Sequence, residues 1–376
     1  MKIPFNKPLI LGNEIDYLKK VINSKSLSGD GKFTQKCNKL IEEKADCMKA
    51  IMTPSCTDAL EMSALLCNIQ SGDEVIMPSY SLVSTASAFV RHNAEIVWCD
   101  VREDTKNIDE TKIELLFSNK TKAIVVVHYA GISSEMDKIL EICKNNNLFL
   151  IEDSAHAIDC FYKGKPLGNF GDFAAISFHQ TKNIQCGEGG ALLVNNPNMI
   201  ERAEFIRDRG TNRIHFNRGI IDEYEWVEMG SNFLMSELQA AFLYPQLLEL
   251  QKITQNRLKS WNTYYQLLSE FLSKDKLPKI PLDVKHNGHL FYIILSSIEQ
   301  RKKITKFLQT KGISAHFHYL PLHKAPFWKG KYNHLELPVT DNVSDTLLRL
   351  PLYFNMSKEE IEYVVKYIKI FFEKVD

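Results

Sequence analysis

From residue 50 to residue 195 the chain alternates short apolar runs with amphipathic stretches of helical periodicity. The runs are apolar on both faces, which is typical of strands in a parallel sheet that helices cover on both sides. Seven runs are predicted to be strands: Ala50–Thr53, Glu74–Met77, Glu95–Asp100, Ala123–His128, Phe149–Glu152, Ala174–Phe178 and Ala191–Asn195. The stretches between them, such as Thr57–Cys67 and Glu135–Asn145, are predicted to be helices. This alternation predicts an α/β fold with a seven-stranded, mostly parallel sheet.

A smaller α+β unit is predicted to follow, because 376 residues exceed the roughly 250–300 at which a single core stops growing. Residues 234–272 are expected to be helical, with Pro245 kinking or dividing the helix because proline lacks the backbone donor. We therefore divide the chain into a large domain, 1–245, and a small domain, 246–376. The last helix should begin at Ser357, with Glu360 completing a capping box.

Composition narrows the class of protein. Lys+Arg and Asp+Glu both number 46, whereas a nucleic-acid binder of this size usually has a basic excess. The eight cysteines form no C-x-x-C pair and are interpreted as free thiols in a reducing compartment. No apolar run approaches the about 20 residues that span a membrane. We expect a cytoplasmic protein that binds neither nucleic acid nor membrane.

Two predicted strands end in groups that suit one cofactor. Asp153 follows the strand Phe149–Glu152, and Lys182 follows Ala174–Phe178, before a glycine-rich turn. Ligands of parallel sheets collect at the carboxyl ends of strands. Pyridoxal 5'-phosphate (PLP) needs a carboxylate that keeps its ring nitrogen protonated and a lysine that carries it as a Schiff base. The same lysine can then move a proton during catalysis. The order of these groups predicts a PLP enzyme.

Further residues are candidates for the cofactor site. Cys56 and Thr57 open a helix after the first strand, where backbone N–H groups can bind phosphate, although plain helix capping by Ser55 or Thr57 is slightly favoured when this turn is taken alone. Ser177 offers a hydroxyl to the same phosphate, or is merely a polar strand end. His156 is placed to hydrogen-bond the cofactor phenolate or to orient Asp153, and a structural role also fits.

A histidine cluster lies in the C-terminal part. His316 and His318 alternate along a predicted strand and therefore share a face, with His323 close behind. No Cys, Asp or Glu is near enough in sequence to complete a metal site, so we predict substrate contacts and no metal. The arginines between 202 and 218 fit either the phosphates of a substrate or a solvated face.

The chain resembles the DegT-type nucleotide-sugar aminotransferases, PLP enzymes of aminotransferase fold type I, almost from end to end. The motifs that carry the resemblance include TPSCTDALEMSALL (53–66), EDSAHA (152–157), SFHQTKNIQCGEGGA (177–191), RGTNR (209–213), FHYLPLH (317–323) and LLRLPL (347–352). Three positions depart from the family's pattern: Leu82 replaces an aromatic residue, Asp58 replaces alanine, and Pro245 interrupts a helix that is usually unbroken.

The resemblance implies a homodimer whose active sites lie at the subunit interface. It implies Lys182 and Asp153 as catalytic residues, and as cofactor ligands Cys56, Thr57, Asp153, His156, Ser177, Lys182 and, from the neighbouring subunit, Asn232. The substrate contacts that we predict are His179, Arg209, Arg213, Tyr319 and His323.

The reaction that the resemblance implies moves an amino group from L-glutamate to C4 of dTDP-4-dehydro-6-deoxy-D-glucose. The products are 2-oxoglutarate and dTDP-4-amino-4,6-dideoxy-D-galactose, for a cell-surface polysaccharide such as enterobacterial common antigen or O-antigen. The gluco epimer, amination at C3 and a non-catalytic sugar-nucleotide-binding regulator stay open as alternatives. A PLP-dependent sugar dehydratase is disfavoured, because relatives with that activity replace the lysine by histidine.

Overall fold

A computed structural model describes residues 1–375 and contains the predicted seven-stranded sheet. Its strands are β1 (Lys49–Thr53), β2 (Glu74–Pro78), β3 (Glu95–Cys99), β4 (Thr121–Val127), β5 (Phe149–Asp153), β8 (Phe173–Ser177) and β9 (Gly190–Val194), in the order β1-β9-β8-β5-β4-β2-β3. Strands β3, β2, β4, β5 and β8 are parallel, and β9 runs antiparallel to both neighbours. The predicted α/β class and all seven strands are confirmed.

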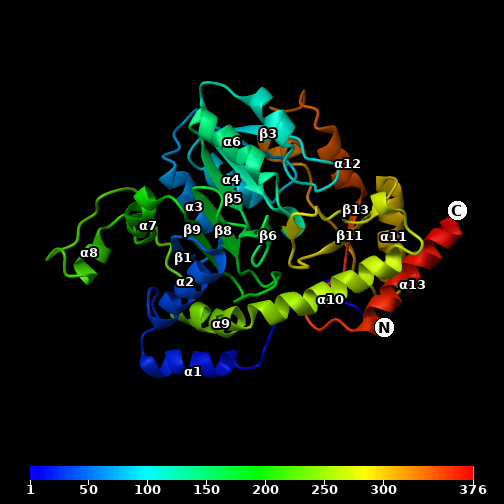
Figure 1. Cartoon of the computed structure of the whole chain (residues 1–376), viewed down its shortest axis with the longest axis horizontal. Helices are drawn as coiled ribbons and strands as arrows, with labels where there is room; N and C mark the ends of the chain where they lie inside the picture. The colour runs from blue at the N-terminus through cyan, green and yellow to red at the C-terminus, as the bar shows by residue number, and fades with distance from the viewer. Residues whose placement is uncertain (376) are drawn as a thin grey trace.

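Helices cover both faces of this sheet (Figure 1). Those of the large part are α1 (Glu14–Ser24), α2 (Lys32–Ala45), α3 (Cys56–Leu66), α4 (Val83–Val90), α5 (Glu110–Ile113), α6 (Met136–Asn146), α7 (Ile200–Arg207), α8 (Arg213–Asn217) and α9 (Glu237–Leu248). Strand pleating explains the two covered faces: Val125 of β4 packs in one apolar cluster, while Ile124 and Val126 pack in another. Burial on both faces is why these strands read as continuous apolar runs.

The C-terminal part is built on a three-stranded antiparallel sheet in the order β11-β13-β12. Its elements are α10 (Leu250–Leu268), β11 (Phe291–Ile294), α11 (Ile298–Thr310), β12 (His316–Phe317), α12 (Pro338–Thr346), β13 (Leu347–Leu350) and α13 (Lys358–Val375). At the start of α13, the Glu360 N–H donates to Ser357 Oγ over 3.2 Å. The Ser357 N–H donates to Glu360 Oε2 over 2.9 Å. The predicted capping box is therefore confirmed.

The two parts are joined more closely than the predicted division at residue 245 suggests. Pro245 lies inside α9, and the helix breaks four residues later at Glu249. Ile253 of α10 packs in a cluster of the large part, whereas Trp261 packs on the small sheet. Helix α10 therefore packs on the large part near its start and on the small sheet further along. Near the N-terminus, Ile3 forms a β-bridge to Ile313, so the first residues of the chain lie against the small part.

Short elements complete the fold. A third sheet joins β6 (Phe161–Tyr162), β7 (Lys165–Pro166) and β10 (Val284–Lys285), and thus links segments far apart in sequence. The 3-10 helices are η1 (Glu114–Leu116), η2 (Tyr129–Gly131), η3 (Pro197–Met199), η4 (Lys274–Lys276), η5 (Leu322–Lys324) and η6 (Pro326–Trp328). Within residues 1–375, none of the helices has both the length and the apolar character needed to cross a membrane. All eight cysteines are unpaired.

Candidate active site

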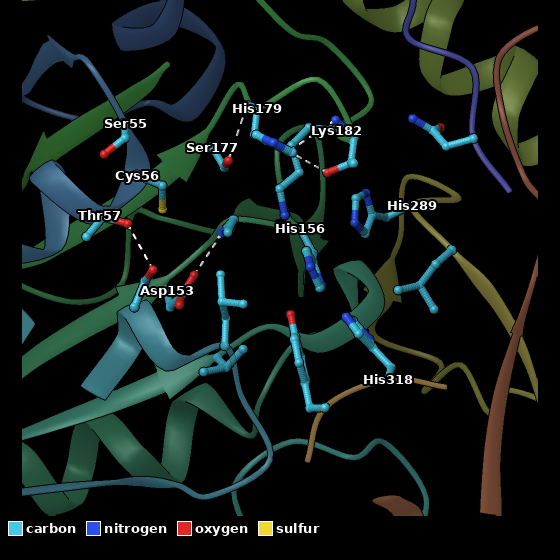
Figure 2. Close-up of a pocket in the computed structure, with 18 of the residues that line it drawn as sticks. Ser55, Cys56, Thr57, Asp153, His156, Ser177, His179, Lys182, His289 and His318 are labelled. Carbon is cyan, nitrogen blue, oxygen red and sulfur yellow. Dashed lines mark hydrogen bonds between the residues drawn. The ribbon is translucent and has the colours of Figure 1, made fainter. Parts of the chain in front are cut away.

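A cavity of about 400 Å³ lies at the carboxyl ends of β4, β5 and β8 (Figure 2). The large part contributes the ends of these strands and the start of α3, and the small part contributes residues around β11, β12 and β13. Phe5 and Asn6, which cross from the large part toward the small sheet, close one side. The cavity therefore occupies the position at which parallel sheets collect ligands.

One end of the cavity is an anion-binding turn. Ser55, Cys56 and Thr57 lie at the N-terminus of α3 and line the cavity, where free N–H groups and the helix dipole favour a phosphate. Gly190 of β9 packs against this turn: a Cβ there would lie 2.4 Å from the Cys56 nitrogen. Only glycine leaves the turn in place. Ser177, at the end of β8, adds a hydroxyl to the same cavity.

Asp58 lies in the first turn of α3 but does not line the cavity. Its Oδ2 accepts a hydrogen bond from Ser55 Oγ over 2.9 Å, and burial raises the pKa of the Asp58 carboxyl. The Ser55 proton is thus directed to Asp58 rather than into the cavity. An anion in this turn would depend on the backbone N–H groups and on Ser177.

Asp153 is held rigidly at the end of β5. Its Oδ2 accepts from Thr85 Oγ1 over 2.7 Å, and its Oδ1 accepts from the Ala155 N–H over 3.1 Å. The side chain is 5% exposed and still forms part of the cavity wall. It is therefore positioned to hold a proton on a cationic ring nitrogen.

Lys182 follows β8, and its side chain enters the same cavity as Asp153 (Figure 2). The pKa of the Lys182 amine is lowered to about 8, chiefly by burial and to a smaller extent by the charge of Arg349, although Cys56 and Asp153 act in the opposite direction. The amine loses its proton as the pH rises through this value. A lysine with a lowered pKa has a larger neutral fraction and is a better nucleophile and base at physiological pH.

Three histidines, two of them buried and His289 half-buried, form another wall. The His156 ring stacks on His289 at 4.2 Å between centroids and lies 6.0 Å from His318. Burial lowers the pKa of all three well below the usual value, so they are neutral near pH 7. His156 Nδ1 accepts from the Ala130 N–H over 3.3 Å. Its proton is therefore on Nε2, which remains available to donate.

Most predicted site residues converge on this cavity. Those that line it are Cys56, Thr57, Asp153, His156, Ser177, His179, Lys182 and Tyr319. His323 does not: its side chain is buried, and its Nδ1 hydrogen-bonds Ser79 Oγ over 2.8 Å. This geometry corrects the predicted substrate contact of His323. Its neighbour His316 instead packs edge-on against Phe5. Among residues 1–375 no group of three His, Cys, Asp or Glu side chains could hold a metal ion.

Three predicted residues lie outside the cavity of their own chain. Arg209 pairs with Asp208, and Arg213 lies over the Tyr224 ring at 5.5 Å from its centroid. Asn232 is exposed and bridges to Asp208. None of the three lines the cavity that holds Lys182 and Asp153.

Several residues that line the cavity were not predicted from the sequence. His289 and Arg349 line it together with Phe5 and Asn6, and none of the four was predicted to be there. In the sequence, only one feature of Arg349 could have indicated a site: it is a charged residue inside the otherwise apolar strand β13, Leu347–Leu350. For the other three, only the tertiary structure brings them to the cavity.

Comparison with known proteins settles the family. Residues 8–369 match the family model described as the DegT/DnrJ/EryC1/StrS aminotransferase family. The chain belongs to this aminotransferase family. It is 28% identical over 370 residues to GDP-perosamine synthase of Escherichia coli O157:H7, covering 98% of both chains.

Solved structures agree with this assignment. PseC of Helicobacter pylori, an aminotransferase involved in the biosynthesis of pseudoaminic acid, superposes with a TM-score of 0.90 at 27% identity, covering 100% of both chains. The PLP form of the putative sugar aminotransferase Spr1654 of Streptococcus pneumoniae superposes with a TM-score of 0.91 at 25% identity, again over 100% of both. The protein is a PLP-dependent aminotransferase of fold type I.

The residues of the cavity fit PLP. The turn at Cys56 and the Ser177 hydroxyl suit its phosphate, Asp153 would hold a proton at the ring nitrogen, and Lys182 would attach the aldehyde. When bound, PLP supplies an electron sink for the electron pair left on a substrate carbon. The Lys182 amine would then move a proton between that carbon and the C4′ carbon of the cofactor. His156 Nε2 provides a donor at the cavity wall.

Proposed function

We propose that the enzyme transfers the amino group of L-glutamate to C4 of dTDP-4-dehydro-6-deoxy-D-glucose. The products are dTDP-4-amino-4,6-dideoxy-D-galactose and 2-oxoglutarate, and the aminosugar enters a cell-surface polysaccharide made from cytoplasmic precursors. The observation that carries the proposal is the shared cavity of Lys182 and Asp153 in a member of this aminotransferase family.

The relatives support a sugar as amino acceptor. One is GDP-perosamine synthase and another is an aminotransferase of pseudoaminic acid biosynthesis. The cavity wall offers polar side chains, among them His179, His289 and Tyr319, that can orient a hydroxylated ring. The dTDP group and the galacto configuration rest on the motif resemblance.

The experiment incubates the PLP-loaded enzyme with glutamate and dTDP-4-dehydro-6-deoxyglucose and determines the product by NMR. We expect an axial amine at C4, the galacto configuration. An equatorial amine would assign the gluco epimer, and amination at C3 would contradict the position. Faster turnover of a GDP-linked 4-dehydro-6-deoxysugar would contradict the dTDP assignment, a comparison that the GDP-perosamine synthase relative motivates.

We also propose a homodimer with shared active sites. The segment around α8 stands apart from the rest of the chain (Figure 1). It exposes large apolar side chains, with Trp226 74% and Met229 67% exposed, which is typical of a protein interface. Arg209, Arg213 and Asn232 lie on or beside this segment, so a partner's cavity could receive them.

Trp226→Asp is expected to weaken this dimer at least tenfold, because it places a charge in an apolar contact that needs desolvation. Light scattering across a dilution series measures the dissociation constant. Leu115→Asp is the matched control, since Leu115 is 84% exposed but lies in η1, outside the segment. A wild-type monomer, or equal effects of the two variants, would contradict the proposed interface.

A further inference from the structure

The first turn of α4 carries two hydroxyl side chains that do not serve the helix itself. Serine and threonine near a helix start usually cap it or bond back to its own carbonyls. The N-cap of α4 is Leu82, which has no capping side chain. The Ser84 hydroxyl instead accepts a hydrogen bond from Thr57 of α3. The Thr85 hydroxyl donates to Asp153 of β5, so the start of α4 contacts both elements that form the cofactor end of the cavity.

The contact between Thr85 and Asp153 is short and buried. Thr85 Oγ1 donates to Asp153 Oδ2 over 2.7 Å, with Thr85 fully buried and Asp153 nearly so. A hydroxyl that donates to a carboxylate stabilises its charged form, and a buried bond of this kind is a strong one. Asp153 Oδ1 accepts from the Ala155 N–H over 3.1 Å. With one donor on each oxygen, the orientation of the carboxylate is fixed.

A charged carboxylate in a fixed orientation is what a cationic ring nitrogen requires. If Asp153 took the proton itself, the ring would lose its positive charge and much of its capacity to accept electrons. Thr85 opposes this transfer, because its hydrogen bond favours the carboxylate over the carboxylic acid. Thr85 does not line the cavity and therefore acts through Asp153. It is a positioning residue rather than a catalytic one.

The contact between Ser84 and Thr57 lies at the phosphate end of the site. Thr57 Oγ1 donates to Ser84 Oγ over 2.9 Å (Figure 2), and both side chains line the cavity beside the anion-binding turn. This bond ties the start of α4 to the start of α3, where a phosphate would bind. Because Ser84 and Thr85 are neighbours, a single helical turn sets the spacing between the phosphate turn and the ring carboxylate.

We propose that the first turn of α4 positions PLP by holding these two groups at a fixed spacing. Thr85 keeps Asp153 charged and directed at the ring nitrogen, and Ser84 keeps the start of α3 in place for the phosphate. The inference rests on the PLP dependence of this family and not on the sugar or the amino donor. Its tests need neither substrate, so their outcome is independent of the proposed reaction.

The first test separates the hydroxyl of Thr85 from its methyl group. Thr85→Val keeps the branched shape and removes the donor, whereas Thr85→Ser keeps the donor and removes the methyl group. We expect Thr85→Val to shift the visible absorption of the bound cofactor and to weaken PLP binding to the full-length apoenzyme about tenfold. Thr85→Ser should keep the wild-type spectrum and bind PLP within about threefold of wild type. Equal effects of the two variants, or the reverse order, would indicate a packing role and overturn the proposal.

Thr346→Val is the matched control for the loss of a buried hydroxyl. Thr346 Oγ1 donates to the Asn342 carbonyl within α12, and Thr346 does not line the cavity. Neither the spectrum nor the PLP affinity of this variant should change. If Thr85→Val does not fold, Thr85→Ala replaces it, since alanine and serine differ by one hydroxyl oxygen. An unchanged spectrum in the variant that lacks the hydroxyl overturns the role of Thr85.

The second test separates the two ends of the cofactor by using pyridoxal, which has the ring nitrogen but no phosphate. Ser84→Ala should weaken PLP binding at least about fivefold and pyridoxal binding less than about twofold, because the lost bond supports the phosphate turn. Thr85→Val should weaken the binding of both compounds by the same factor, since both contain the ring nitrogen. Wild-type binding of PLP by Ser84→Ala, or equal losses for PLP and pyridoxal in that variant, would overturn the proposed role of α4.

Discussion

Replacing Lys182 with alanine is expected to lower the rate of amino transfer at least about 10⁴-fold. The variant loses the amine that attaches the cofactor and also the base that moves the proton at the substrate carbon. It should still bind PLP, because the turn at Cys56, Ser177 and Asp153 are unchanged. Single-turnover absorbance with glutamate measures the rate.

Two comparisons make this result specific to Lys182. Lys144→Ala, an exposed lysine in the last turn of α6, should keep the wild-type rate. A small added amine, such as ethylamine, should restore part of the activity of Lys182→Ala, since it supplies the missing base. A variant that retains a tenth of the wild-type rate would show that another group moves the proton.

Asp153→Asn is expected to lower kcat by about 10³-fold with little change in fold. Asparagine has the same shape and can keep a contact to Thr85 or to the Ala155 N–H, but it carries no charge to hold a proton at the ring nitrogen. The visible absorption of the bound cofactor should shift, which a purely structural defect would not cause.

The matched control for Asp153 is Asp137→Asn, an exposed carboxylate that pairs with Lys163 at the surface. It should leave both kcat and the spectrum unchanged. Wild-type activity in Asp153→Asn would mean that the ring nitrogen does not need a carboxylate, and the assignment of the strand-end acid would be wrong.

Local pattern was sufficient for the central sheet, because each strand is buried on both faces and therefore reads as an apolar run. It was not sufficient for the two-residue strands of the β6-β7-β10 sheet, which are too short to carry an alternation. The break after α9 was expected from Pro245 but falls at Glu249, since the chain stays helical for the remaining turn.

Some residues of the site could likewise be predicted from local sequence, and others could not. Asp153 and Lys182 were identifiable because both follow strands whose carboxyl ends must meet at one edge of a parallel sheet. His323 was predicted to contact substrate because it is near His318 in sequence. That proximity does not determine which side chains after a turn point into the cavity, and His323 instead contacts Ser79. His289 and Arg349 reach the cavity only through the packing of the small sheet, a long-range contact that no local pattern records.

Reductive trapping tests most directly whether the cofactor is bonded to Lys182. The PLP-loaded enzyme is treated with borohydride, digested, and mapped by mass spectrometry. The peptide that contains Lys182 should carry the reduced cofactor, and Lys182→Ala should yield no labelled peptide. A label on another lysine of the wild-type protein, or none at all, would contradict the assignment of Lys182 on which the proposed chemistry depends.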